Sequence, residues 1–325
     1  MNTDEVNANQ GKIVLAPMEG VVDSTMRHVI TQLGGVDLCV TEFIRVTDRV
    51  LSPREILKHA TELSGSGLTP SGVPVAVQLL GSVPEVLAQS AIEAVKMGAP
   101  SIDLNFGCPS KTVNKHRGGA VLLDEPDLIH AIVKTVRQAV PQNIAVTAKM
   151  RLGNLDKSLA LDNAKAITDA GADGLAIHAR TKVEGYKPPA HWEWIGRIKE
   201  EVDIPIVANG EVWNCEDYQR CRALSGCEDV MIGRGLIARP ELGLMIKSYQ
   251  LGTNHSGAAW RDIISILLHY FAIVESQLPP KYVHGRIKQW LHMMRPQREE
   301  AEGVFREVKI LSDLNQLRAR LEAEL

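Results

Sequence analysis

The sequence predicts an α/β protein built as a (β/α)8 TIM barrel that is followed by a small all-helical C-terminal domain. Eight short, β-rich apolar runs alternate with helix-like segments up to about residue 250. The runs stay apolar almost to their last residues, as expected of parallel strands that are buried on both faces. Beyond Gly252 the chain has helical spacing without further strand signals.

The predicted strands begin at Ile13, Leu38, Val75, Ile102, Ala145, Gly174, Ile204 and Val230. Between them we expect helices, for instance over residues 84–97, 127–139 and 159–170. Eight βα units over about 240 residues match the size of a closed barrel. A doubly wound sheet is the alternative, but the first strand lacks the G-x-G-x-x-G that a dinucleotide-binding sheet carries at that point.

Three regions are expected: a polar N-terminal tail (1–11), the barrel (12–252) and the helical domain (253–325). The tail has no signal-peptide pattern, and no apolar run reaches the roughly 18 residues of a membrane span. The five cysteines are scattered, which favours a reducing compartment. We therefore expect a cytoplasmic protein that is not anchored to a membrane.

Polar residues end nearly every predicted strand. In a barrel the functional site lies at the carboxyl ends of the strands, so these residues are expected to share one face. Each alone has a structural explanation, such as a lysine that snorkels from the rim. Together they predict a site, formed in chain order by Met18 and Glu19, Glu42 and Arg45, Gln78, Asn105 and Cys108, Lys149 and Arg151, His178 and Arg180, Asn209 and Glu211, and Gly233 and Arg234.

The last two strand ends predict a phosphate site. "ANGEV" and "IGRG" supply small residues whose backbone N–H groups can approach a phosphate, and Arg234 adds positive charge. Barrels commonly bind phosphate at this place. A phosphorylated cofactor or substrate is therefore expected.

Lys149 ends the fifth strand, and two chemical roles are open for it. It is either a Schiff-base lysine, as in some aldolases, or a fixed positive charge. The sequence shows no obvious partner that would lower its pKa, which favours the fixed charge. Beside a flavin it would stabilise the anion of the reduced ring, while Gln78 and Asn105 would supply amide hydrogen bonds.

Cys108 lies between Gly107 and Pro109 at the end of the fourth strand. A lone cysteine is most often a small core residue, and only the position in this ring favours a chemical role. Cys215, Cys221 and Cys227 repeat at a spacing that fits no zinc pattern, so we expect them to pack in the interior and expect no metal.

Residues 281–298 form a basic stretch without Asp or Glu, in which Tyr282 and Trp290 are interleaved. The net charge of −3 gives no global sign of nucleic-acid binding. A run of charge is usually a solvated face, but this one is a candidate partner surface.

Several motifs resemble those of the tRNA-dihydrouridine synthases, flavin enzymes that reduce uridines of tRNA. They are "APMEGVVDS", "TEF", "VQLLG", "DLNFGCPSKTVNKHRGGAVLL", "AKMRLG", "IHARTK", "IPIVANGEV" and "VMIGRG". The resemblance covers the whole barrel, and "YVHGRIKQWL" is most similar to the bacterial C-type branch, which implies reduction at position 16 of the D-loop.

The resemblance implies a bound FMN, with NADPH or NADH as the transient electron donor. The residues implied for FMN are Pro17, Met18 and Glu19 along the ring, Gln78 and Lys149 at its polar edge, His178 beside them, and Asn209, Gly210, Glu211, Gly233 and Arg234 around the phosphate. Asn105 and Cys108 are implied to face the uracil. The implied tRNA contacts are Arg45, Tyr186, Tyr282, Arg286, Lys288 and Arg306.

The implied chemistry is hydride transfer to C6 of the uracil and protonation of C5 by Cys108. An ordinary thiol is mostly protonated at pH 7 and is therefore suited to act as an acid. Three alternatives remain: a reductase of free pyrimidines like dihydroorotate dehydrogenase, a flavin-free aldolase, and a non-catalytic tRNA-binding protein. No DNA and no obligate protein partner is expected.

Overall fold

The computed structural model describes residues 10–253 and 256–325. Most of the predicted polar tail lies outside the described residues. The predicted boundary between barrel and helical domain, near residue 253, lies next to the second gap and stays a prediction.

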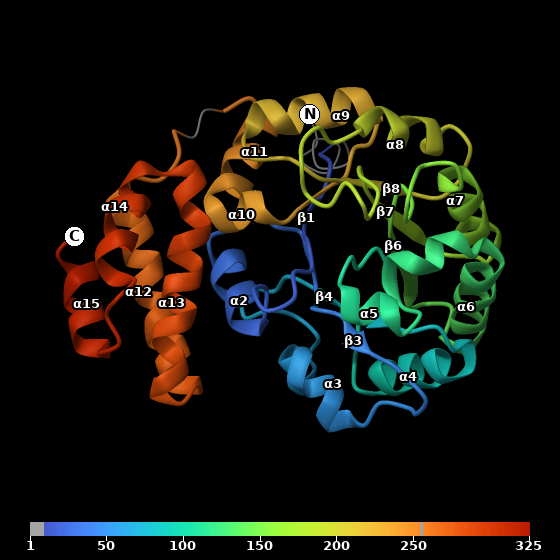
Figure 1. The fold of residues 1–325 in the computed structure, drawn as a ribbon, viewed down its shortest axis with the longest axis horizontal. Coiled ribbons are helices and arrows are strands. Elements are labelled where there is room, and N and C mark those ends of the chain that lie inside the picture. Colours follow the sequence, from blue (N-terminus) through green and yellow to red (C-terminus); the bar gives the residue numbers. More distant parts are fainter. Residues whose placement is uncertain (1–9, 254–255) are drawn as a thin grey trace, which may run out of the picture.

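Eight parallel strands close into a barrel (Figure 1), which confirms the predicted fold class. They are β1 (Ile13–Leu15), β2 (Leu38–Val40), β4 (Val75–Leu80), β5 (Ser101–Phe106), β6 (Ala145–Arg151), β7 (Gly174–His178), β8 (Ile206–Asn209) and β9 (Val230–Ile232). β1 pairs with both β2 and β9, and β2 also pairs with β4, so that the strands form a closed ring.

A few details differ from the predicted strands. β5 begins at Ser101, one residue before its predicted start. The seventh barrel strand, β8, begins at Ile206 rather than Ile204, because Pro205 has no N–H to give to the ladder. A further two-residue strand, β3 (Ile44–Arg45), pairs with the end of β4 and carries the chain toward the barrel mouth.

Helices surround the barrel (Figure 1). They are α2 (Ser24–Gln32), α3 (Pro53–His59), α4 (Pro84–Lys96), α5 (Lys111–Lys115), α6 (Pro126–Ala139), α7 (Ala160–Asp169), α8 (Trp192–Lys199), α9 (Cys215–Ser225), α10 (Arg234–Ala238) and α11 (Leu242–Gln250). Their starts follow local chemistry: α2 begins where the Asp23 carboxylate accepts a hydrogen bond from the Met26 N–H at 2.9 Å.

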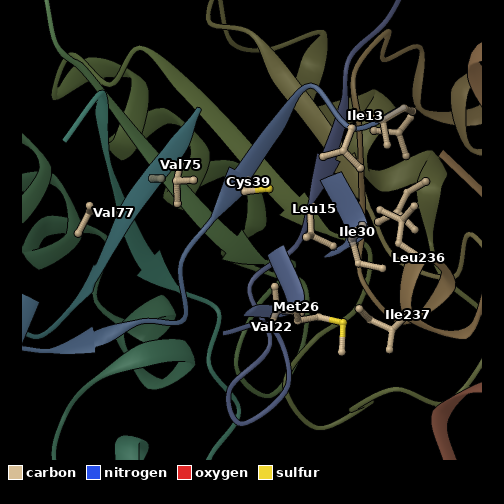
Figure 2. Close-up of a cluster of buried hydrophobic side chains, with 14 of the residues drawn as sticks. Ile13, Leu15, Val22, Met26, Ile30, Cys39, Val75, Val77, Leu236 and Ile237 are labelled. Carbon is tan, nitrogen blue, oxygen red and sulfur yellow. The ribbon is translucent and has the colours of Figure 1, made fainter. Parts of the chain in front are cut away.

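Alternate residues of each strand face opposite sides of the barrel wall. Ile13 and Leu15 of β1 lie among side chains of α2 and α10 (Figure 2), outside the barrel. Val14 belongs instead to a separate inner cluster with residues of β2, β4, β7 and β9. Both faces are therefore buried, and the residues that share the inward parity near the strand ends are the polar ones, from Gln78 to Asn209.

The C-terminal helices stand beside the barrel next to α2 and α10 (Figure 1). They are α12 (Trp260–Gln277), α13 (Pro280–Met294), α14 (Glu299–Val308) and α15 (Leu314–Glu322). The buried Trp290 of α13 donates its indole N–H to the Ile237 carbonyl of α10 at 2.9 Å and packs edge-on against Tyr270. This contact ties the helical bundle to a helix that lines the site. None of the helices in the described residues is long and apolar enough for a membrane span.

Trp290→Phe should lower the free energy of unfolding by about 1–3 kcal/mol, because the Ile237 carbonyl loses its buried partner. Trp194 is half-buried on the outer helix α8, so Trp194→Phe is the control. This substitution should change the free energy of unfolding by less than about 1 kcal/mol. Urea denaturation measures both. Equal losses would show that the indole hydrogen bond does not anchor the bundle.

Candidate active site

A pocket of about 840 Å³ opens at the carboxyl ends of the barrel strands. Its lining includes every residue predicted for the cofactor: Pro17, Met18, Glu19, Gln78, Lys149, His178, Asn209, Gly210, Glu211, Gly233 and Arg234. The predicted acid and three of the predicted substrate residues line it as well, namely Cys108, Asn105, Arg45 and Tyr186. The structure thus brings these residues together, while their individual roles stay predictions.

Cys108 is held in place through its backbone. The Asn105 amide oxygen accepts hydrogen bonds from the N–H groups of Gly107 and Cys108, both at 2.9 Å. The Cys108 carbonyl accepts in turn from the Asn114 amide at 2.8 Å and from the Ala120 N–H at 3.0 Å. The thiol therefore sits on a loop whose position is determined on both sides.

Burial raises the pKa of the Cys108 thiol above its ordinary value, and a hydrogen bond with the Ser110 backbone only partly offsets this. The thiol is consequently protonated at neutral pH. This state suits a proton donor and does not suit a nucleophile, which acts as the thiolate.

Lys149 extends from β6 into the pocket and donates to the Asn209 amide oxygen at 3.0 Å. Asn209 is itself oriented, because its amide nitrogen donates to the Met231 carbonyl at 2.8 Å. Burial, together with the nearby Arg151, lowers the pKa of Lys149 to about 8. The sequence showed no partner that would do this, but a lysine with this pKa is still mainly charged at pH 7.

His178 lies among four cationic side chains, which are those of Lys149, Arg151, Arg180 and Arg234. Burial and these charges hold the pKa of His178 well below its ordinary value, so the ring is neutral. Its buried Nδ1 makes no hydrogen bond within the described residues. The excess of positive charge and the unpaired ring nitrogen fit a polar, anionic ligand.

Glu211 organises part of this cationic cluster. It accepts from Arg180 and from the indole N–H of Trp213 at 2.9 Å, and it lies 3.5 Å from Arg234. Burial alone would raise the pKa of Glu211, but these hydrogen bonds and charges lower it, so the carboxylate is ionised. Glu211 thus orients the basic groups around the pocket, and its backbone adopts a positive φ of 61° to do so.

Glycine backbone lines the pocket where the sequence predicted a phosphate. Gly233 lies so close to Met18 that an added Cβ would stand 3.1 Å from its sulfur. At Gly235 an added Cβ would stand 2.1 Å from the Val212 carbonyl oxygen. Larger residues would fill this corner or push its walls apart. Because glycines stand there instead, backbone N–H groups beside Arg234 remain open to a phosphate.

The loop that carries Pro17, Met18 and Glu19 is fastened from two directions. The Gly20 N–H donates to the Glu42 carboxylate at 2.5 Å. From the helical bundle, Arg286 donates to the Gly20 carbonyl at 2.7 Å and forms an ion pair with Asp23 at 2.5 Å. Arg286, which was predicted to contact tRNA, is engaged here with the loop.

The other predicted tRNA residues of the bundle lie outside the pocket. Tyr282 is exposed, with the Lys281 ammonium 4.8 Å above its ring. Lys288 donates to the Lys309 carbonyl at 3.0 Å, and Arg306 is exposed beside Glu302. Met293 of α13 does reach the pocket, so the bundle contributes to its wall.

Arg151, which was predicted as part of the ring of polar strand ends, also shapes the pocket. Arg151 donates to the carbonyls of Gly107, Thr181 and Gly185, at 2.9–3.1 Å. Its guanidinium lies 5.1 Å from the Tyr186 ring, and that of Arg234 lies 5.0 Å from the same ring. The polar strand end "KMR" pointed to Arg151, but no sequence signal marked the stacking. The prediction that Cys221 and Cys227 pack in the interior is confirmed, and Cys215 is half-buried.

Comparisons with known proteins find a family match, similar sequences and a similar fold. A family model described as "Dihydrouridine synthase (Dus)" matches residues 14–321. A Pseudomonas putida protein named tRNA-dihydrouridine(16) synthase is 51% identical over 313 residues, which are 96% of this chain and 97% of that protein. One of the same name from Neisseria meningitidis serogroup A is 47% identical over 96% of this chain and 94% of its own length. The solved histamine dehydrogenase of Rhizobium sp. 4-9 shares the fold, with a TM-score of 0.57 at 14% identity over 74% of this chain and 46% of its own.

Gly119→Ala should disturb the Cys108 loop. Gly119 has a φ of 66°, and an added Cβ would stand 2.7 Å from the Cys108 carbonyl oxygen. Gly72→Ala is the matched control, since Gly72 has a φ of 83° but no atom within 4 Å of an added Cβ. Backbone strain of about 1–3 kcal/mol is common to both variants, so urea denaturation should show a larger loss for Gly119→Ala. Equal losses would mean that the contact with Cys108 is absorbed without cost.

Proposed function

Because the chain belongs to the dihydrouridine synthase family, we propose that it reduces the C5–C6 double bond of uridine 16 in the D-loop of tRNA. The product is 5,6-dihydrouridine. The observation that carries the proposal is a protonated, backbone-held Cys108 in the same pocket as a cluster of cations around an unpaired His178 nitrogen.

The pocket fits FMN as the cofactor. An unpaired buried ring nitrogen, an excess of cations and a glycine-lined corner suit a polar ring system that carries a phosphate. The residues that would hold it are those predicted from the sequence, with Lys149 and His178 at the ring and Gly210, Gly233 and Arg234 at the phosphate. When bound and reduced by NADPH or NADH, FMN supplies a hydride for C6 of the uracil ring.

The chain's own residues handle the proton and the charge. Cys108 donates its thiol proton to C5, because burial keeps the thiol protonated at neutral pH. Lys149, oriented by Asn209, supplies positive charge that is already in place when negative charge develops. Asn105 acts mainly by holding the Cys108 loop, since its amide oxygen is engaged by the two loop N–H groups.

Binding of tRNA is the role we propose for the helical bundle, residues 253–325, together with Arg45 and Tyr186 at the pocket. A uridine in folded tRNA has to leave its stack before it reaches the pocket, which costs a few kcal/mol that backbone contacts must offset. Tyr282, Lys288 and Arg306 lie on the bundle surface or near it. Arg286 contributes by fastening the bundle to the loop of Met18. A tRNA substrate and free cysteines fit a cytoplasmic protein.

Dihydrouridine formation in a tRNA transcript tests the proposal. With FMN and NADPH present, the purified protein should convert U16 and leave a U16→C transcript unreduced. Cys108→Ala should keep FMN and tRNA affinity but lose about 10²–10⁴-fold in turnover, the usual contribution of an acid. Reduction of free uracil or orotate without tRNA turnover would favour a pyrimidine reductase. Unchanged turnover in Cys108→Ala would exclude the acid role.

The double variant Lys281→Glu/Lys288→Glu on α13 should weaken tRNA binding about tenfold and reduce its salt dependence, because fewer phosphate counterions are released. Oxidation of NADPH by the flavin should not change. Lys134→Glu/Lys165→Glu, on α6 and α7 across the barrel from the bundle (Figure 1), is the charge-matched control. Filter binding at several salt concentrations measures the effect. Similar losses in both doubles would contradict a tRNA surface on α13.

A further inference from the structure

Asp103 of β5 is a buried carboxylate that the proposed mechanism does not use. Only 2% of the residue is exposed, and it does not line the pocket. One carboxylate oxygen accepts from the Thr147 hydroxyl at 2.6 Å, and the other accepts from the Gln78 amide nitrogen at 2.7 Å. A buried carboxylate is costly unless it is well hydrogen-bonded, so its presence calls for an explanation.

A chain of hydrogen bonds leads from Asp103 to Cys108. The Gln78 amide oxygen accepts from the Asn105 amide nitrogen at 2.7 Å. The Asn105 oxygen then accepts from the N–H groups of Gly107 and Cys108. These side chains come from neighbouring strands of the barrel, since Gln78 lies opposite Asp103 in the register of β4 and β5.

The direction of this chain is determined at both ends. Burial raises the pKa of Asp103, whereas the hydrogen bonds from Thr147 and Gln78 favour its ionised form. As a carboxylate it can only accept, so Gln78 turns its NH₂ group toward Asp103 and its oxygen toward Asn105. Asn105 must then present its NH₂ group to Gln78 and its oxygen to the loop. At the other end, the two backbone N–H groups can only donate, which requires the same orientation of Asn105.

We propose that Asp103 is a positioning residue for Cys108: by orienting the amides of Gln78 and Asn105, it holds the loop that presents the thiol to the substrate. The inference rests on the proposed function only in taking Cys108 as the proton donor. Thr147 completes the arrangement by occupying the second carboxylate oxygen.

The test is a rescue experiment. Asn105→Asp keeps an acceptor for the loop but loses the donor to Gln78, so Gln78 is left between two acceptors. Adding Asp103→Asn restores a satisfied chain in which Gln78 is turned around: the new amide at position 103 donates to the Gln78 oxygen, and the Gln78 NH₂ group donates to the new carboxylate at position 105. Asp103→Asn alone should be mild, because its amide can donate to the Thr147 oxygen and its oxygen can still accept from Gln78.

Alkylation of Cys108 by iodoacetamide, followed on its peptide by mass spectrometry, reports how the loop is held. Asn105→Asp should change the rate on the order of tenfold, as expected for one lost buried hydrogen bond. Asp103→Asn/Asn105→Asp should return to within about threefold of the natural protein. Additive effects of the two substitutions would overturn the proposal, because independent sites add.

A control variant distinguishes restored hydrogen bonding from the mere relief of repulsion between negative charges at positions 103 and 105. Asp103→Ala/Asn105→Asp removes the same negative charge without supplying a donor, and it should not restore the rate. Equal rescue by alanine would show that charge alone was responsible and would overturn the proposal.

Hydrogen exchange offers a second measurement if Asn105→Asp does not fold. In Asp103→Ala the amides of Gly107 and Cys108 should exchange on the order of tenfold faster than in the natural protein. Unchanged exchange would overturn the proposal. Both measurements need neither tRNA nor turnover, so a protein that fails to make dihydrouridine but shows the rescue refutes the proposed function alone.

Discussion

Closure of the barrel between β1 and β9 is the constraint on which the rest of the structure depends. The Val230 N–H donates to the Lys12 carbonyl at 2.9 Å, and the Ala16 N–H donates to the Ile232 carbonyl at 3.0 Å. These hydrogen bonds bring the first strand end, with Met18, against the last, with Gly233. Because every strand is parallel, closure also places all carboxyl ends on one face, where polar residues from eight strands can share one pocket.

The pocket combines unusual electrostatics with a rigid frame. Buried cations around a neutral His178 are compensated in the protein by Glu211, which leaves positive charge directed at the pocket. Such an arrangement is costly for the folded protein alone and is relieved when an anion binds. The frame comes from hydrogen bonds to the backbone: Arg151 holds three carbonyls, and Asn105 holds two N–H groups. Uncompensated positive charge and a rigid hydrogen-bonded frame are the two properties expected of a binding site that is preorganised for its ligand.

The helical bundle is fastened to two segments that adjoin the pocket. Arg286 and Gln289 both donate to the Gly20 carbonyl, and Trp290 on the same helix donates to Ile237 of α10. One face of α13 therefore grips the two segments that adjoin the pocket at the first and last strands. Its first turn exposes Lys281 and Tyr282. A single helix thus carries part of the basic stretch and also fastens the loop that contains Met18.

The sequence by itself determined the barrel and most of the polar side chains that line the pocket, because a buried parallel strand is apolar until it reaches the functional face and a polar residue there is conspicuous. Cys108, Lys149 and Arg234 could be found in this way. Only the tertiary structure decided what each polar atom contacts. Arg286 appeared in the sequence as part of a basic stretch, yet it fastens a loop 263 positions away in the chain, at Asp23. Asp103 was not among the predicted site residues, because its role consists of hydrogen bonds to Gln78 and Thr147 on neighbouring strands. Local pattern reveals which face a residue occupies, whereas its partners come from strands that meet only when the barrel closes.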